Sequence, residues 1–307
     1  SFPTRRSSDL LFHRNFMGYH SDRFTDHSLL VYIDQHLSAI LPANIQEGSV
    51  IFSHQGLSYG GFVFHEAITM EHVMEIVSEV LKYLNGIKIQ KFFYKSLPKF
   101  YSRVGSDEMD YLHFILESKM YRRDIASVVN MKGKIEFHKR RIRGARKAKK
   151  NGVEINYDDD LTSFWNEILE PNLKERFNVK PVHTLDEITL LQNEFPENIH
   201  QCNAYIEGEI VAGVTIFESA YVAHAQYISG SELGRKSGAL DLLVSELLLQ
   251  RYQNVDYFDF GICNENAGKK INRGLLNWKE GWGARPFVHE FYEIDVSNYQ
   301  KLASVLI

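Results

Sequence analysis

The sequence predicts an α/β protein with mixed sheets, built from two similar domains in tandem. The chain has 307 residues, whereas one hydrophobic core rarely serves more than about 300. The same order of elements occurs twice: a β-hairpin, a strand, an amphipathic helix and another strand, at an offset of about 170 residues. Hydrophobic residues make up 44% of the chain and charged residues 24%, which excludes a disordered chain.

The first copy of this order begins with a predicted hairpin, two apolar strands at 29–34 and 37–41 around the turn dipeptide Gln35-His36. An amphipathic helix follows later and ends at Asn85-Gly86. Its apolar residues recur at helical spacing: Val73, Ile76, Val77, Val80, Leu81 and Leu84. The other strands of this half are expected at 50–54, 89–94 and 111–117.

The second copy repeats the pattern. Strands are predicted at 203–207 and 210–217, around Gly208-Glu209, because Gly208 can supply the positive φ of a two-residue hairpin turn. The helix of this half is indicated by the apolar positions Leu240, Leu243, Val244, Leu247 and Leu248. The other strands are expected at 221–229, 257–261 and 287–294.

Three further helices are predicted between the two copies. They cover residues 134–150, 160–177 and 185–194, and the last begins with the capping box Thr184-x-x-Glu187. We therefore expect an N-terminal domain over residues 11–133 and a C-terminal domain over 134–307. Residues 1–10 read like the translation of a sequencing adapter, so we set them apart and expect the natural N-terminus to be missing.

Charge is unevenly distributed along the chain. Residues 139–150 hold eight basic side chains and no acidic one, so the rest of the chain carries a formal charge of −12 within a total of −4. This pattern argues against a general polyanion-binding surface and predicts no stable DNA binding. The basic helix has three readings: it grips tRNA or acceptor phosphates, it touches anionic lipid headgroups, or it is a solvated helix between domains.

Composition also bounds the cellular setting. The two cysteines, Cys202 and Cys263, are too few for a disulfide framework, which favours a reducing, cytoplasmic environment. No apolar run approaches the ~18 residues of a membrane helix, so no transmembrane segment is expected. No His, Cys or carboxylate cluster has metal-ligand spacing, and we predict no metal site.

The chain resembles the FemAB-like branch of the GNAT superfamily of acyltransferases, and the resemblance covers nearly all of it after residue 10. It is carried by these motifs: His224-Ala-Gln-Tyr227, Gly234-Arg-Lys-Ser-Gly-Ala-Leu240, Tyr257-Phe-Asp-Phe-Gly261, Asn264-Glu265, Asn272-x-Gly274-Leu275, Lys279-Glu-Gly-Trp-Gly283 and, in the first half, Ser53-His-Gln-Gly-Leu-Ser-Tyr-Gly-Gly61. The resemblance implies two tandem GNAT-like domains, the first of them degenerate, and an acyl or aminoacyl transfer to an amine bound between them.

The resemblance leaves the donor open between an acyl thioester, such as acyl-CoA, and aminoacyl-tRNA; neither is a permanently bound cofactor. The acceptor is expected to be a small-molecule amine or a cell-envelope precursor, and tRNA is a candidate partner of residues 139–150. The rival interpretations are a non-catalytic module that binds tRNA or another polyanion, and a structural pseudoenzyme.

The donor-binding candidates lie in the segment before the second amphipathic helix. GNAT proteins hold donor phosphates with an Arg/Gln-x-x-Gly-x-Gly/Ala loop at a helix N-terminus, where backbone amides and the helix dipole attract anions. This sequence keeps the arginine and the first glycine but has Leu240 in place of the small last residue. The predicted donor loop comprises Arg235, Lys236, Ser237, Gly238 and Ala239.

The catalytic candidates of the second half are Lys279, Glu265, His224 and Tyr227. In the resembled family a lysine at the Lys279 position lies near the reacting carbonyl or the phosphates, and a fixed cation there would stabilise developing negative charge. We expect it to flank an apolar stripe formed by Ile271, Leu275, Trp278 and Trp282. Glu265 is read either as the acceptor of the amine proton or as a solvated loop acid.

Period two places His224 on one strand face with Gln226, and Tyr227 on the other. His224 is either a proton shuttle or a satisfied half-buried histidine, and Tyr227 is a candidate proton donor to a leaving thiolate. The substrate-binding candidates are Asp259, Asn264, Asn272, His54 and Tyr59. Asp259 is expected to anchor a loop or to pair with a base, with acid/base work as the alternative, and the glycine-rich segment after His54 equally fits a tight turn.

Overall fold

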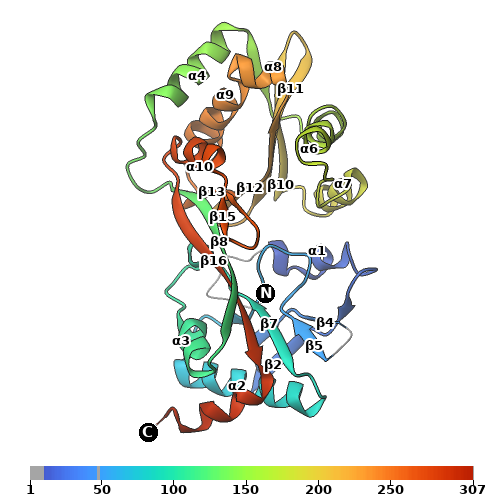
Figure 1. Ribbon diagram of the computed structural model, residues 1–307, viewed down its shortest axis with the longest axis vertical. Coiled ribbons are helices and arrows are strands. Elements are labelled where there is room, and N and C mark those ends of the chain that lie inside the picture. Colours follow the sequence, from blue (N-terminus) through green and yellow to red (C-terminus); the bar gives the residue numbers. More distant parts are fainter. Residues whose placement is uncertain (1–9, 47–48, 307) are drawn as a thin grey trace. The chain divides into compact units, whose positions relative to one another are not determined.

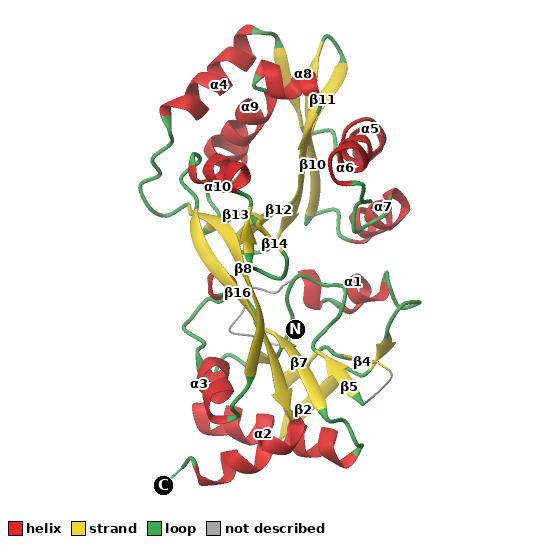
Figure 2. Cartoon of the chain, viewed as in Figure 1, coloured by secondary structure: helices red, strands yellow, loops and turns green. Residues whose placement is uncertain are grey.

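The computed structural model describes residues 10–46 and 49–306, which form two compact units (Figures 1 and 2). Unit 1 comprises Ser1–Ile125, Asn264–Lys270 and Phe287–Ile307, and unit 2 comprises Ala126–Cys263 and Ile271–Pro286. Both units combine sheets and helices, as the sequence predicts. No helix in the described part of the chain combines the length and apolar character needed to cross a membrane.

Unit 1 contains a mixed sheet in the order β1-β4-β5-β7-β16 and a separate small sheet in the order β2-β3-β6. The strands of the first are β1 (Thr25–Asp26), β4 (Asn44–Gln46), β5 (Val50–Phe52), β7 (Lys91–Lys95) and β16 (Arg285–Asp295). Those of the second are β2 (Leu29–Ile33), β3 (His36–Leu41) and β6 (Val63–Phe64). The helices are η1 (Leu10–Phe12), α1 (Arg14–Gly18), α2 (Met70–Gly86), η2 (Lys99–Tyr101), α3 (Glu108–Ile115) and η5 (Val296–Ser304).

Helix α2 forms the apolar centre of unit 1. Thr69 caps it by accepting a hydrogen bond from the backbone N–H of His72. Its predicted apolar positions, among them Val73, Val77 and Leu81, are all buried and pack against β7 and the small sheet. The predicted hairpin appears as β2 and β3, paired antiparallel.

Unit 2 contains a sheet in the order β8-β13-β12-β11-β10-β9. Its strands are the C-terminal part of β8 (Lys119–Asn130), then β9 (Val153–Asn156), β10 (Ile199–Ile206), β11 (Glu209–Glu218), β12 (Val222–Gly230) and β13 (Tyr257–Ile262). The strands β14 (Asn264–Glu265) and β15 (Lys270–Ile271) form a two-stranded sheet that follows β13 in the chain and belongs, except for Ile271, to unit 1. Gly208 has a φ of 83° in the β10–β11 turn, as the hairpin requires.

Helices cover both faces of this sheet, with α4, α9 and α10 on one side and α6 and α7 on the other (Figure 1). The first group is α4 (Lys139–Lys150), α8 (Glu232–Ser237), α9 (Ala239–Glu246) with its continuation η4 (Leu247–Arg251), and α10 (Arg273–Glu280). The second is a continuous run of α5 (Leu161–Ser163), η3 (Phe164–Leu169) and α6 (Glu170–Phe177), followed by α7 (Leu185–Glu194), whose predicted capping box is present.

A single carboxylate joins α4, α9 and α10. Asp241 of α9 accepts a hydrogen bond from Arg141 Nη1 of α4 at 2.5 Å and one from Trp278 Nε1 of α10 at 3.2 Å. A Cβ at Gly144 of α4 would lie 2.0 Å from Asp241 Oδ2, so only glycine permits this approach. Burial raises the pKa of Asp241 and the Arg141 guanidinium opposes that rise.

Four expectations need correction. Residues 111–117 are not a strand, because Met109, Leu112 and Leu116 are buried at helical spacing in and just after α3, and the strand of this region is β8. The basic helix begins at Lys139 instead of residue 134. The segment 235–240 is helical instead of a loop, with a left-handed Gly238 between α8 and α9.

The apolar stripe expected on α10 is the fourth. It is wrong at one end only: Ile271 and Leu275 are exposed, at 49% and 38%, whereas Trp282 is buried in the apolar core of unit 2 and Trp278 packs against that core. Within α10 the buried side chain is Lys279. The compact units also differ from the predicted domains 11–133 and 134–307, because β16 pairs with β7 and returns residues 287–307 to unit 1. Of the segment 1–10, residues 1–9 lie outside the described part, and Leu10 is buried in η1.

We predict that Asp241→Ala lowers the free energy of unfolding by about 3–5 kcal/mol, because it leaves the half-buried Arg141 guanidinium without its partner. Equilibrium unfolding in urea measures this change. Glu246→Ala is the matched control, since Glu246 pairs with an exposed lysine, Lys149, and exposed pairs contribute about 1 kcal/mol or less. Equal effects of the two substitutions would contradict the joining role of Asp241.

Candidate active site

The candidate site lies where two parallel strands of unit 2 separate. Strands β12 and β13 pair over three positions only, and His224 opposite Asp259 is the last of them. Beyond it β12 runs on to Gly230, while β13 shifts its register against β8 between Asp259 and Ile262. Gly261 takes a φ of 71° at this irregularity. Backbone groups of β13 therefore lose their strand partners at this point and need others.

Lys279 supplies those partners. Its Nζ donates to the carbonyl oxygens of Gly261 and Ile262, at 2.9 and 2.8 Å. The side chain is only 3% exposed, and burial lowers the pKa of Lys279 to about 8, with Asp259 and Cys263 opposing the shift. An ammonium has three N–H donors, so two such bonds leave one for a ligand. The lysine is thus fixed in direction and still charged at neutral pH.

Asp259 and His224 form a second polar group at the same place. Asp259 is 1% exposed and accepts hydrogen bonds from His224 Nδ1 at 2.7 Å and from the Gly261 N–H at 2.7 Å. An ionised carboxylate can only accept, so Nδ1 carries the proton. His224 Nε2 lies 3.1 Å from Gln226 Oε1, and because an amide oxygen can only accept, this contact becomes a hydrogen bond when Nε2 carries a proton. The arrangement orients the imidazole and leaves Nε2 as the atom that gains or loses a proton.

These groups together can perform two tasks of acyl chemistry. The free N–H of Lys279 can stabilise an oxyanion, because a preorganised cation in a water-poor site costs little reorganisation. His224 Nε2 can accept a proton from a nucleophile while Asp259 stabilises the resulting imidazolium. Within residues 10–46 and 49–306 no set of His, Cys, Asp and Glu side chains is arranged to hold a metal ion.

Comparison with solved structures finds proteins that share the fold of this chain. No protein-family model matches the chain, and no curated protein matches it in sequence. Among solved structures, FemX superposes with a TM-score of 0.66 at 11% identity over 92% of each chain. The C-terminal domain of a putative lysylphosphatidylglycerol synthetase from Agrobacterium fabrum gives 0.59 at 13% identity, over 99% of this chain and 94% of that one. A tandem GNAT protein from the clavulanic acid biosynthesis pathway gives 0.51 at 9%, over 90% and 86%.

The chain has a FemAB-like, tandem GNAT fold. The predicted fold class is thereby confirmed, while identities this low leave the activity to be argued from the site. In this FemAB-like fold the structure brings together three of the predicted residues, Lys279, His224 and Asp259. Asp259 pairs with His224 and also accepts from the Gly261 N–H, which fits its interpretation as an anchor or a partner of a base, and its part in acid/base work stays a prediction.

Three other candidates lie just beyond β13 in the chain. Asn264, in unit 1, is buried and forms two hydrogen bonds with β8. Its side chain accepts from the Ile125 N–H and donates to Asp124 Oδ1. Glu265, also in unit 1, is exposed. Asn272 caps α10 by accepting from the Leu275 N–H at 3.0 Å. Asn264 and Asn272 thus have structural contacts, and any role of the three in binding stays a prediction.

Tyr227 faces away from His224, as the strand period predicts. Its hydroxyl lies 2.7 Å from His183 Nδ1 and accepts a hydrogen bond from the His183 N–H at 3.1 Å. Its ring packs edge-to-face against Trp165, with ring centroids 4.9 Å apart. The contacts with His183 and Trp165 therefore account for the burial of Tyr227 without a ligand.

The predicted donor segment is engaged with the protein itself. Arg235 Nη1 donates to the Gly230 carbonyl at 2.6 Å, Lys236 pairs with Glu232, and Ser237 Oγ donates to the Gly234 carbonyl. A Cβ at Gly238 would lie 2.6 Å from the Gly144 carbonyl oxygen, so α4 packs closely over the start of α9, where Ala239 is also buried. The glycine of this motif is therefore required by helix packing, and a phosphate-binding role stays a prediction.

Unit 1 contains a comparable separation of parallel strands after Phe52 and Phe93, in β5 and β7. There Lys95 Nζ donates to the carbonyl oxygens of His54 and Leu57, at 3.1 and 2.6 Å, and burial lowers the pKa of Lys95 to about 8. The candidate His54 is buried with a φ of 71°, and burial lowers its pKa to about 4.

The segment after His54 turns back over this gap. A Cβ at Gly60 would lie 2.1 Å from the Ser53 carbonyl oxygen, and a Cβ at Gly61 would lie 2.4 Å from Tyr94 Oη. The tight turn alone therefore explains why these positions are glycine. Tyr59 is buried against Tyr101, with ring centroids 4.7 Å apart. Lys95 and Gln226 are the site-like residues that sequence reasoning did not select. Gln226 could have been found from the period that places it beside His224.

We predict that Lys279 titrates near pH 8 in the folded protein. NMR of ¹³Cε-labelled lysine measures this, and Lys279→Met identifies the resonance, since Lys95 titrates in the same range. The ordinary lysine pKa is 10.5, so between about pH 8 and 10.5 the unfolded chain binds more protons at this group. Its contribution to the free energy of unfolding therefore rises with pH across that window. A titration at the ordinary lysine pKa would contradict the burial of this ammonium.

Proposed function

We propose that the chain is an acyltransferase that moves an acyl or aminoacyl group from a thioester or an aminoacyl-tRNA to an amine. The observation that carries this proposal is the placement of the Lys279 ammonium beside the His224–Asp259 pair at the separation of β12 and β13. The FemAB-like fold is its second support, because FemX, a tandem GNAT protein and a lysylphosphatidylglycerol synthetase domain share it.

In the proposed reaction the acceptor binds as the neutral amine, its ammonium proton released to solvent, because only a neutral amine has the lone pair for attack. The amine nitrogen bonds to the donor carbonyl carbon, and the remaining N–H of Lys279 faces the oxyanion of the tetrahedral intermediate. The nitrogen, now positively charged, gives one proton to His224 Nε2, and Asp259 stabilises the imidazolium through Nδ1. Collapse breaks the bond to the thiol or ribose oxygen, which takes the proton held by His224.

The donor is proposed as either acyl-CoA or charged tRNA. The tandem GNAT neighbour, whose structure was determined without AcCoA, supports the first, and the resemblance of the sequence to the FemAB-like branch supports the second. The acceptor class is a small-molecule amine or a cell-envelope precursor. Incubating the purified protein with an acyl-CoA panel and with charged tRNA, then following deacylation with candidate amines, tests the proposal directly. Deacylation that depends on an amine supports transfer, whereas no turnover with any donor counts against it.

A second candidate function, a module that binds tRNA or another polyanion without turnover, is favoured by one observation on α4. Seven of its eight basic side chains are exposed, and the eighth, Arg141, pairs with Asp241. Lys147 and Lys149 contact Lys236 O and Glu246. The remaining five form no hydrogen bond or ion pair within the described residues: Lys139, Arg140, Arg143, Arg146 and Lys150.

We predict that Lys279→Met lowers kcat by about 30- to 1,000-fold with little change in either KM, because it removes a charge that acts on the transition state. Met retains most of the stem contacts. It also leaves two carbonyls without their donor, so circular dichroism must first establish that the variant is folded at the assay temperature. Lys269→Met, at an exposed lysine, is the control. A folded Lys279→Met protein with normal turnover would refute the catalytic assignment.

We predict that tRNA binding, if α4 provides it, depends steeply on salt. Replacing Arg143, Arg146 and Lys150 together by Gln should reduce the slope of log K against log salt by about 2–3, one phosphate contact for each cation removed. Filter binding at several salt concentrations measures the slope. The same triple change should leave deacylation of acyl-CoA at the wild-type rate. An unchanged slope would mean that these basic side chains of α4 are solvated and do not contact tRNA.

A further inference from the structure

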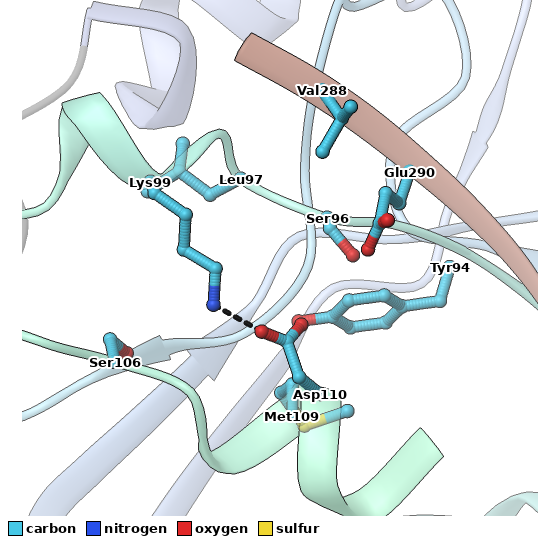
Figure 3. A pocket seen from close by; sticks show the side chains of 9 residues that line it. All are labelled: Tyr94, Ser96, Leu97, Lys99, Ser106, Met109, Asp110, Val288 and Glu290. Carbon is cyan, nitrogen blue, oxygen red and sulfur yellow. Dashed lines mark hydrogen bonds and ion pairs between the residues drawn. The ribbon is translucent and has the colours of Figure 1, made fainter. Parts of the chain in front are cut away.

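Unit 1 contains a small cavity next to the end of β7. Its volume is about 40 Å³, enough for about three groups the size of a water molecule (Figure 3). The walls come from the end of β7, from η2, from the first turn of α3 and from β16. The lining residues are Tyr94, Ser96, Leu97, Lys99, Ser106, Met109, Asp110, Val288 and Glu290.

One lining group has no partner. The Ser96 hydroxyl oxygen is buried and forms no hydrogen bond within the described residues. In Figure 3 it points toward the Glu290 carboxylate, among the residues that line the cavity. An unsatisfied buried hydroxyl costs free energy, so its position indicates that a polar group from outside the chain completes the site.

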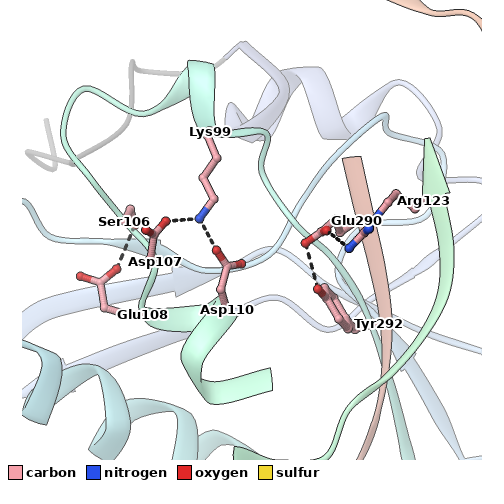
Figure 4. Close-up of polar contacts among 8 residues, drawn as sticks. All are labelled: Lys99, Ser106, Asp107, Glu108, Asp110, Arg123, Glu290 and Tyr292. Carbon is pink, nitrogen blue, oxygen red and sulfur yellow. Dashed lines mark hydrogen bonds and ion pairs between the residues drawn. The ribbon is translucent and has the colours of Figure 1, made fainter. Parts of the chain in front are cut away.

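Two carboxylates stand on different walls of the cavity, and each is held by a cation of the protein (Figure 4). Lys99 Nζ bonds to Asp110 and also to Asp107, which does not line the cavity. Glu290 accepts from Arg123 Nη2 at 2.5 Å and from the Tyr292 hydroxyl at 2.9 Å. These contacts fix the carboxylates in place before any ligand arrives, which reduces the entropy that binding would cost.

Negative charge exceeds positive charge around the cavity. Figure 4 shows four carboxylates, including Glu108 beside Ser106, against the two cations Lys99 and Arg123. Lys99 uses two hydrogen bonds for Asp107 and Asp110, and only Oδ2 of Asp110 takes part in them. Asp110 Oδ1 has no donor within the described residues. An acceptor oxygen without a donor, in a place with excess negative charge, favours a cation over an anion.

The other walls are apolar. Leu97 and Met109 are buried, the Tyr94 ring contributes one side, and Val288 is 46% exposed at the surface. A fully hydrated inorganic ion would gain nothing from these walls, whereas a short hydrocarbon chain would remove them from water. The combination of fixed acceptors and apolar walls therefore selects for an amphipathic cation.

We propose that this cavity binds a small organic cation, a primary ammonium group on a short apolar chain, with the ammonium between Asp110, Glu290 and the Ser96 hydroxyl. An ammonium offers three donors, and these three groups offer acceptors to it. The hydrocarbon chain lies along Leu97, Met109 and Val288. The inference does not depend on acyl transfer, since an ammonium held by two carboxylates keeps its proton and is no nucleophile.

The test uses the full chain and n-propylammonium as the probe. We expect a dissociation constant on the order of millimolar, as suits a ligand of four heavy atoms. The measurement is a ¹H–¹⁵N NMR titration at fixed ionic strength, with shifts expected at the backbone amides of Ser96, Met109 and Asp110. n-Propanol, which has the same chain without the charge, should bind at least about tenfold more weakly.

Variants locate the site. Glu290→Gln and Asp110→Asn should each weaken n-propylammonium binding by about tenfold or more. Glu108→Gln is the matched control, because it removes a carboxylate of the same cluster that does not line the cavity, and it should change the affinity less than twofold. Val288→Trp, at a half-exposed position, should block entry without removing a polar group, so it keeps the test decisive if a carboxylate variant unfolds.

Three outcomes would overturn the proposal: no shifts with n-propylammonium at ten times the expected dissociation constant, equal binding of n-propanol, or equal weakening by Glu108→Gln. The first would mean that the cavity holds water only. The second would make it an apolar cavity, and the third would reduce the effect to general surface charge. None of these results bears on the transferase assay, whose success or failure is measured separately by deacylation.

Discussion

The arrangement of unit 2 depends on how the protein supplies hydrogen-bond donors to the end of β13, where this strand has separated from β12. Strands β12 and β13 separate after His224 and Asp259, and the carbonyls of Gly261 and Ile262 then need donors inside the protein. Lys279 provides both. The same contact orients an ammonium, lowers its pKa to about 8 by burial and places it beside Asp259. One side chain thus both completes the hydrogen bonds at the end of β13 and provides a fixed cation for chemistry.

Unit 1 meets the same constraint differently. After β5 and β7 separate, Lys95 donates to two carbonyls of the segment that follows β5, and Ser53 Oγ accepts from the Lys95 N–H at 2.8 Å. That segment folds back, and the Tyr94 hydroxyl accepts from the Phe62 N–H. The gap that carries a histidine and a carboxylate in unit 2 is filled by the protein's own backbone in unit 1. That the first domain is a degenerate copy stays a prediction.

Local patterns in the sequence were sufficient for most elements, because turn residues and apolar spacing act over a few positions. The hairpins, α2, the α7 capping box and the opposite faces of His224 and Tyr227 all follow from such patterns. The α3 error arose because the helical spacing begins at Met109, two residues before the segment that was interpreted as a strand. Long-range contacts escaped prediction: neither the burial of Lys279 nor the packing of Gly238 against Gly144 leaves a local trace.

The pairing of β16 with β7 also orders events during synthesis. A ribosome releases residues 91–95 long before residues 285–295, so the sheet of unit 1 must wait for one of its strands until residues 285–295 have emerged. During that interval the nascent chain exposes the edge of β7, whose unpaired backbone groups can join any other extended segment. Chaperone dependence and sensitivity to premature termination are therefore expected to concentrate in unit 1, although its sequence is translated first.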